Sequence, residues 1–253
     1  MITLSSASNT MYTSDVSSKY TTNHALIPSF FLAVVILAIP ASPARGAIGC
    51  TLSNPAEDLK YLYPALTSYR EDLKELSRYT NGPALFAALQ ERLGTDLDPV
   101  YETFETPYTL YSIFKGDQVV GYVHGVNVPG QGGVIQLFLA VDPATGAIAR
   151  FFFQRLESRE AKALRARPFT AAFAGLSLAD FYKFDYFRRQ PSDSIPDAVT
   201  RLKELFLLAT GKPDHEATLR GVRKNLILLD IFVFGRRSEP FYQRAREALN
   251  ATK

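Results

Sequence analysis

The chain contains 253 residues, of which 47% are hydrophobic and 21% are charged, as in an ordinary globular protein. Its formal net charge of +3 is too small to indicate a nucleic-acid-binding protein. Cys50 is the only cysteine, and the three histidines are scattered at positions 24, 124 and 215, so the sequence predicts neither an internal disulfide nor a metal site.

The first part of the chain has the composition of a targeting segment. Residues 1–24 are rich in Ser, Thr and Asn, which predicts a disordered polar leader. Residues 25–39 form an uncharged apolar run, shorter than the roughly 20 residues of a spanning helix and suited to a secretory signal. We expect residues 25–46 to be a signal peptide or a retained membrane anchor, with a buried helix as the alternative. The protein is then exported, periplasmic or membrane-associated.

The cysteine lies shortly after this segment. Ala47-Ile48-Gly49-Cys50 faintly resembles a bacterial lipobox, in which the cysteine is acylated after cleavage. However, Ala47 stands where a lipobox usually has Leu, and the apolar run ends too early. A free cysteine, buried or exposed, is the favoured interpretation of Cys50.

We expect residues 47–107 to form a helical N-terminal part of the domain. Residues 68–79 are predicted to be a helix that carries the paired acids Glu71 and Asp72. Because Lys74 follows Glu71 at helical spacing, the acids indicate a solvated helix face and not a catalytic pair. The sequence contains no G-x-S-x-G or H-E-x-x-H motif either, so no enzymatic activity is indicated.

Four β-rich runs follow, separated by short turns. The expected strands are residues 109–114, 118–124, 134–141 and 147–154. Such short turns join antiparallel strands, whereas parallel strands need long crossovers, so the pattern predicts an antiparallel β-meander. Helical patterns lie on either side of it, which indicates a single main domain of the α+β class.

Five glycines fall within thirteen residues before the third expected strand, a density that suggests a phosphate-binding loop. Gly125 and Gly130 have the spacing of a P-loop, but Gln131 and Gly132 stand where Lys and Ser or Thr are required. The next run is β-rich and not helical. We therefore interpret residues 130–133 as a hairpin connection in which glycine supplies positive φ.

The middle of the chain resembles a known family. The strand GVIQLFLAVD, a turn ending in glycine, the strand GAIARFFF and the segment QRLESREAKALRARPFTAAFAG follow one another as in the FMN-binding domain. That domain occurs in flavin subunits of Na⁺-pumping and Rnf-type membrane oxidoreductases and in exported relatives. The matching residues are Asp142, Gly146 and Ile148 in the turn and strand, Glu157-Ser158-Arg159 at the family's E-T-P position, and Phe169, Phe173 and Gly175 at its helix end.

The resemblance covers roughly residues 108–235. It implies an FMN-binding-like α+β core over 108–237, followed by a C-terminal helix at 238–253. In the family, a flavin transferase attaches FMN through a phosphoester to the threonine of a D-x-x-S-G-A-T segment that opens a helix. Residues 211–222 resemble that segment, with His215-Glu216 in place of Ser-Gly and with Ala217-Thr218 and Arg220-Gly221 family-like.

The resemblance implies that any flavin is FMN held by its phosphate near Thr218, noncovalently rather than covalently. A gapless alignment places Glu216 and not Thr218 at the attachment position. The candidate cofactor-binding residues are Thr218, Ala217, Glu216, Arg220, Gly221, Glu157 and Ser158.

Physical chemistry gives the same segment two interpretations. Thr218 precedes an apolar helical pattern beginning at Val222, so we expect it to be an N-cap, where unpaired N–H groups suit a phosphate. Arg220, Arg223 and Lys224 are then cationic partners of the phosphate. In the alternative, Thr218 only caps the helix and the basic residues face solvent.

Two functions remain open. The first is a redox module that binds FMN and passes electrons to a membrane oxidoreductase or another membrane complex. The second is a structural or assembly subunit that kept the fold and lost the cofactor. Residues 180–187 hold five aromatics, which flavin rings could stack on, but core filling is the commoner use, and we expect most of them in the core.

Overall fold

The computed structural model describes residues 50–189 and 194–251, all within the unit Arg45–Lys253. The expected leader at 1–24 and the targeting segment at 25–46 lie outside these described residues. Among the described residues, none of the helices is long and apolar enough to cross a membrane.

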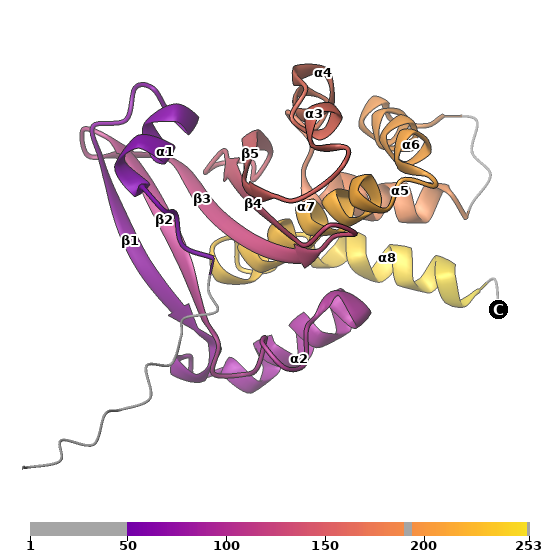
Figure 1. Cartoon of the computed structure of the whole chain (residues 1–253). Coiled ribbons are helices and arrows are strands. Elements are labelled where there is room, and N and C mark those ends of the chain that lie inside the picture. Colours follow the sequence, from indigo (N-terminus) through magenta and orange to yellow (C-terminus); the bar gives the residue numbers. More distant parts are fainter. Residues whose placement is uncertain (1–49, 190–193, 252–253) are drawn as a thin grey trace, which may run out of the picture. The chain divides into compact units, whose positions relative to one another are not determined.

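The described residues form an antiparallel sheet with helices on both faces (Figure 1). The strands are β1 (Ser68–Glu75), β2 (Pro107–Lys115), β3 (Gln118–Pro129), β4 (Val134–Val141) and β5 (Ile148–Leu156). The α-helices are α1 (Pro55–Leu62), α2 (Gly82–Leu93), α3 (Ala161–Leu164), α4 (Arg167–Ala171), α5 (Leu178–Phe187), α6 (Asp197–Ala209), α7 (Pro213–Phe232) and α8 (Glu239–Asn250). Two short 3₁₀ helices, η1 (Leu76–Arg78) and η2 (Gly94–Asp96), flank α2.

The strands are ordered β1-β2-β3-β4-β5, each antiparallel to the next, so the expected α+β fold with a β-meander is confirmed. The turn between β4 and β5 shows how the sequence directs the chain back. One carboxylate oxygen of Asp142 accepts hydrogen bonds from the backbone N–H and the hydroxyl of Thr145, both at 2.7 Å. Gly146 then closes the turn with a φ of +68°, which glycine adopts without steric cost.

Strand β1 replaces the helix expected at residues 68–79, and that prediction is wrong. β1 pairs with β2 over its whole length, from Ser68 opposite Phe114 to Glu75 opposite Pro107. It lies at the edge of the sheet, and most of its side chains are exposed. Edge strands often carry charges, which oppose pairing with other chains. The charges that suggested a helix surface therefore belong to an exposed strand, and the expected helical N-terminal part contains β1 between α1 and α2.

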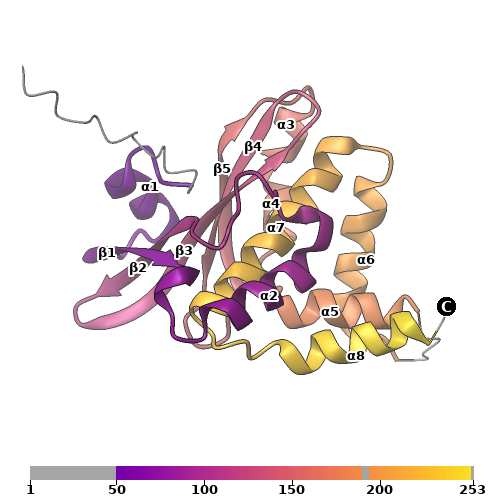
Figure 2. The ribbon, with the colours of Figure 1, turned by 90° about the horizontal axis from the view of Figure 1, so that it is seen from below.

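The two faces of the sheet carry separate cores. Figure 2 shows α1 on one side of the sheet, and α2, α5, α6, α7 and α8 on the other. On the α1 side, Leu59 and Leu62 pack with the buried rings of Tyr111 and Phe138. The chain before α1 is bound to the same face, because the Leu52 N–H donates to the Tyr111 hydroxyl at 3.0 Å.

Cys50 also belongs to the core on the α1 side. It is a free cysteine with 6% of its surface exposed. Burial raises the pKa of its thiol to about 12, so the thiol stays protonated and unreactive near neutral pH. Cys50 is therefore a free cysteine as predicted, and of the two alternatives, buried or exposed, it is buried.

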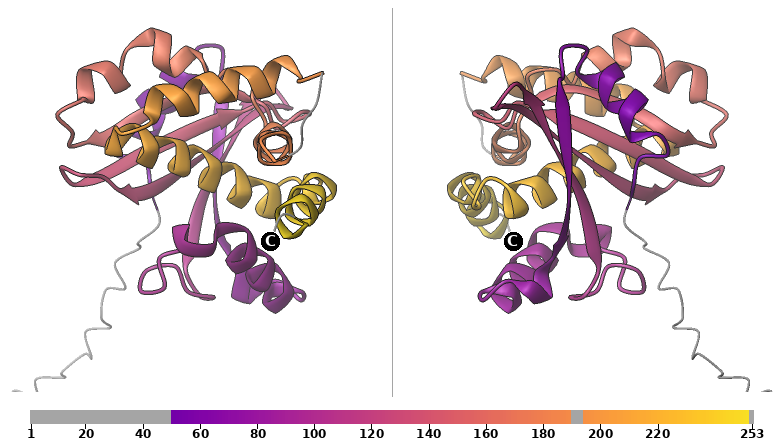
Figure 3. Two further views of the ribbon diagram at one scale, coloured as in Figure 1. Left: turned by 90° about the vertical axis from the view of Figure 1, so that its right-hand side faces the viewer. Right: turned by 90° about the vertical axis from the view of Figure 1, so that its left-hand side faces the viewer.

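Helix α7 lies across the other face of the sheet, as the left view of Figure 3 shows. The two approach closely at Gly221, where a Cβ atom would lie 2.7 Å from the Leu137 side chain and 3.2 Å from that of Val128. One turn further on, the side-chain amide of Asn225 donates to the His124 carbonyl oxygen at 2.8 Å, and its oxygen lies 3.0 Å from His124 Nδ1. Burial lowers the pKa of His124 to about 4, so this ring is neutral at physiological pH.

The aromatic residues of α5 divide between core and surface. Phe181, Tyr182 and Phe184 are buried, and Phe184 stacks on Phe206 of α6 with ring centroids 4.6 Å apart. The prediction that most of this aromatic run fills the core is confirmed. Tyr186 and Phe187, at the end of the helix, are only partly buried.

Candidate functional site

Three segments that are distant in sequence meet at the start of α7. They are the β3–β4 hairpin at residues 130–133, the segment 157–160 after β5, and the first turn of α7. The Gln131 N–H donates to the Asp214 carboxylate at 2.6 Å, and the Ser158 hydroxyl donates to the other oxygen of the same carboxylate. Of the predicted site residues, Ser158 is thus brought to the helix that carries Thr218, and Glu157 lies beside the hairpin.

The hairpin has the connection that its glycines indicate. The Gly130 N–H donates to the Gly133 carbonyl oxygen at 2.8 Å, and Gly133 has a φ of +143°. Gly132 does not have a positive φ, so its backbone conformation does not explain why glycine occupies this position. A Cβ atom there would overlap the carbonyl oxygen of Glu157 and lie 3.1 Å from its carbonyl carbon. The close approach of segment 157–160 therefore requires the glycine.

Thr218 is not an N-cap, and that prediction is wrong. Helix α7 begins at Pro213, with Lys212 as its N-cap. Proline suits the first helical position because its missing N–H would have no helical partner there. His215 and Glu216 replace the family's Ser-Gly. Without a glycine at position 216, which would disfavour a helix, α7 continues through both residues. Thr218 is fully buried inside the helix, and its hydroxyl donates to the Asp214 carbonyl oxygen at 2.7 Å.

The side chain of Asp214 occupies the position that a helix N-terminus offers to an anion. Asp214 is 3% exposed and lies in the first turn of α7, where the positive end of the helix dipole favours a negative charge. Its two oxygens accept from the Gln131 N–H and from the Ser158 hydroxyl. The Asp214 carboxylate therefore has the surroundings that a bound phosphate would have. The anion at this helix start is a side chain of the protein itself and not a ligand.

The residues beside Asp214 are held in place as well. His215 is 3% exposed, its Nδ1 lies 2.9 Å from a carboxylate oxygen of Glu160, and its ring meets the ring of Phe169 edge-on. Glu216 is exposed, and its carboxylate accepts from the Gly211 N–H at 3.1 Å. Both residues that replace the family's Ser-Gly thus have partners within the domain.

The three expected cationic partners of a phosphate are paired with acids elsewhere. Arg220 lies 3.5 Å from Asp96 of η2, and Arg223 lies 2.5 Å from Asp185 of α5. The third, Lys224, is buried and lies 2.5 Å from Glu102. The alternative that all three face solvent is wrong for Arg223 and Lys224, and none of the three points at the start of α7 as a free cation within the described part of the chain.

The predicted site residues therefore do not form one cluster. Glu157 lies against the hairpin, and Ser158 contacts the start of α7. Ala217 and Thr218 are buried in the helix, Gly221 packs on the sheet, and Arg220 contacts η2. The acceptor role of Asp214 was not predicted from the sequence. The dipeptide Pro213-Asp214 is a helix-start signal that could have revealed it.

Two cavities in the described part of the chain lie away from this position. One of about 720 Å³ lies between α5 and α8. One of about 260 Å³ lies between the β4–β5 turn, the start of α5 and the end of α7.

No protein-family model matches this sequence, and no curated protein matches it. FMN binding remains a prediction from resemblance, and the residues present at the α7 start do not fit its phosphate.

Proposed function

We propose that this protein is a noncatalytic structural or assembly subunit with an FMN-binding-like fold and no flavin. The observation that carries the proposal is the buried Asp214 carboxylate at the start of α7. Its hydrogen bonds use the donors that a phosphate would need. The folded domain then serves as a rigid platform whose surfaces bind a partner. The buried Asp214 side chain fills the position at which the family binds the phosphate of its cofactor.

The charges at this position favour the carboxylate over a phosphate. A helix N-terminus stabilises an anion by roughly 0.3–2 kcal/mol. Two like charges about 4 Å apart repel by about 4 kcal/mol at an effective dielectric constant of about 20. A phosphate beside Asp214 therefore loses more from repulsion than it gains from the helix dipole. The three cations expected to offset this loss, Arg220, Arg223 and Lys224, are paired with other acids.

Burial of Thr218 supports the same proposal. Phosphoester formation needs a hydroxyl that a transferase can reach, and this hydroxyl is fully buried and donates within the helix. Exposing it requires the first turns of α7 to unwind, which breaks the hydrogen bonds of Asp214 and separates His215 from Glu160.

The absorbance spectrum of the native protein tests this proposal. We expect no bands of oxidised flavin, either before or after acid denaturation, and none after coexpression with a flavin transferase in excess FMN. A yellow protein with one flavin per chain would overturn the proposal. Flavin retained by a Thr218 peptide after acid treatment would identify it as covalently bound.

A flavin-carrying electron-transfer module is the second candidate function. It is favoured by one observation, the convergence of residues 130–133, Glu157-Ser158 and the start of α7. In this case FMN phosphate must displace the Asp214 side chain. Asp214→Asn would then bind FMN more tightly than the wild type, whereas the first proposal expects no saturable binding by either protein.

The proposed subunit works outside the cytoplasm or at a membrane. The support is the apolar run at 25–39 with its Pro/Ala-rich continuation. Mass spectrometry of the native protein should find a mature start between residues 45 and 50, or an intact chain in the membrane fraction. A full-length product in the soluble cytoplasmic fraction would contradict this localisation.

A further inference from the structure

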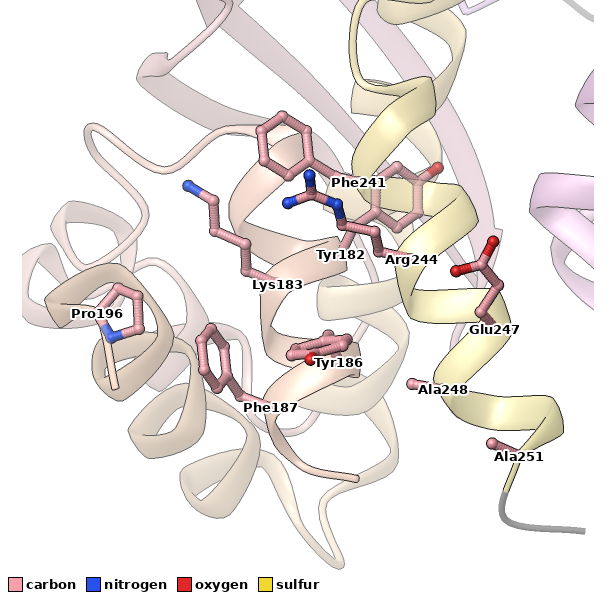
Figure 4. Close-up of a pocket in the computed structure, with 10 residues that line it drawn as sticks. All are labelled: Tyr182, Lys183, Tyr186, Phe187, Pro196, Phe241, Arg244, Glu247, Ala248 and Ala251. Atoms are coloured by element: carbon pink, nitrogen blue, oxygen red, sulfur yellow. The ribbon is translucent and has the colours of Figure 1, made fainter. Parts of the chain in front are cut away.

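A groove of about 720 Å³ lies between α5 and α8, close to the start of α6 (Figure 4). Its volume falls within the range of roughly 300–1,000 Å³ that is typical of small-molecule sites. The groove is lined mostly by apolar and aromatic side chains, with charged groups at its margins. This site is separate from the start of α7, so it does not depend on whether the protein binds flavin.

The floor of the groove is aromatic. Tyr186 and Phe187 are its partly buried aromatic residues from α5, with ring centroids 5.4 Å apart and ring planes at 88°. Because these rings are perpendicular, they do not offer a common flat face to a planar ligand. On the α8 side, Ala248 and Ala251 are small and leave room above the rings. A flexible apolar chain suits this surface better than a flat ring.

One end of the groove is cationic. Arg244 of α8 is exposed and makes no ion pair among the residues that the structure describes. Figure 4 shows its guanidinium directed toward α5, and the carboxylate of Glu247 directed away from α5. The opposite wall carries Lys183, whose ammonium lies 5.2 Å from the centre of the Phe241 ring and 3.3 Å from Asp180.

The other arginine near the middle of α8 shows what is particular about Arg244. Arg246 is ion-paired with Glu91 of α2. Arg244 instead keeps its donors at the mouth of an apolar groove. A guanidinium presents two parallel N–H donors, which match a carboxylate.

We infer that this groove binds a small amphiphile with a carboxylate head and an aliphatic chain, of the fatty-acid class. The carboxylate pairs with Arg244, whereas Lys183 on the opposite wall is already paired with Asp180. The chain lies over Tyr186 and Phe187 and extends toward Ala251. This inference goes beyond the proposed function, because a subunit without flavin does not require a lipid site.

Calorimetric titration of the purified protein with saturated fatty acids of increasing length, below their micelle concentrations, tests the inference. Each methylene buried in the groove should tighten binding about fourfold, until the groove is full and the affinity stops rising. The alcohol of the same chain length should bind at least tenfold more weakly, since it cannot pair with Arg244. Absence of saturable binding, or equal binding of acid and alcohol, would overturn the inference.

Two matched variants locate the site. Arg244→Gln should weaken fatty-acid binding at least tenfold, whereas Arg246→Gln on the same helix should leave it unchanged. Both residues are exposed, so neither variant should alter the melting temperature by more than a few degrees. Equal loss in the two variants would show a nonspecific effect of charge and contradict the assigned site. Phe187→Ser should shorten the chain length at which the affinity stops rising, and an unchanged length would place the chain elsewhere.

Discussion

Replacing Asp214 with alanine tests how much the buried carboxylate contributes to the fold. The change removes the acceptor of the Gln131 N–H, at 2.6 Å, and of the Ser158 hydroxyl. Hydrogen bonds to a charged group contribute roughly 1.5–3 kcal/mol each. The negative charge in the first helical turn adds roughly 0.3–1 kcal/mol. Allowing for water that enters the truncated site, we expect the free energy of unfolding to fall by about 3 kcal/mol.

Urea unfolding followed by far-ultraviolet circular dichroism measures this loss. Asp197→Ala is the matched control, because Asp197 lies in the first turn of α6 but is exposed. It should cost less than about 1 kcal/mol, which is the contribution of the helix dipole alone. Asp214→Asn keeps one acceptor and should fall between the two. If Asp214→Ala costs no more than the control, the carboxylate is not the internal anion that we describe.

Three further perturbations test the packing around this helix. Gly132→Ala should cost roughly 1–3 kcal/mol, because its Cβ would overlap the Glu157 carbonyl; an unchanged melting temperature would contradict the close approach. Arg92→Ala should cost roughly 3–5 kcal/mol, because it leaves the buried Asp230 carboxylate, 2.7 Å from the guanidinium, without its cationic partner; urea unfolding measures this. The pKa of His124 is lowered to about 4 in the folded state, so its contribution to stability is present above pH 6.5 and is lost as the pH falls toward 4. That loss of unfolding free energy should approach about 3 kcal/mol in the wild type and be absent from His124→Gln. If the unfolding free energies of the two proteins change with pH in parallel, the reasoning is refuted.

The strands of the meander could be predicted because their signals are local. Apolar runs alternate with turns, and Asp142 and Gly146 fix one turn through their own hydrogen bonds and φ. Strand β1 could not be predicted in this way. Its charged residues fit an exposed helix as well as an exposed edge strand, and only the pairing with β2, from a distant part of the sequence, separates the two.

The candidate site was predicted only in part, because its chemistry depends on where a helix begins. The sequence placed the N-cap at Thr218, more than one turn beyond the true N-cap at Lys212. It therefore predicted an open N-terminus where the structure has a buried hydroxyl. The bond between Ser158 and Asp214 joins residues that no local pattern connects. The groove could not be predicted either, because it also depends on contacts between distant segments. Tyr186 and Phe187 line it, while the neighbouring Phe184 fills the core. Only the position of α8 distinguishes the two lining residues from Phe184.

Equilibrium titration of the wild-type protein with FMN, followed by the quenching of flavin fluorescence, tests the central claim most directly. Asp214 supplies the anion at the start of α7, so the account predicts no saturable quenching and no rise of the melting temperature with added FMN. Saturable binding of one FMN per chain, lost in Thr218→Val but retained in Arg244→Gln, would contradict it.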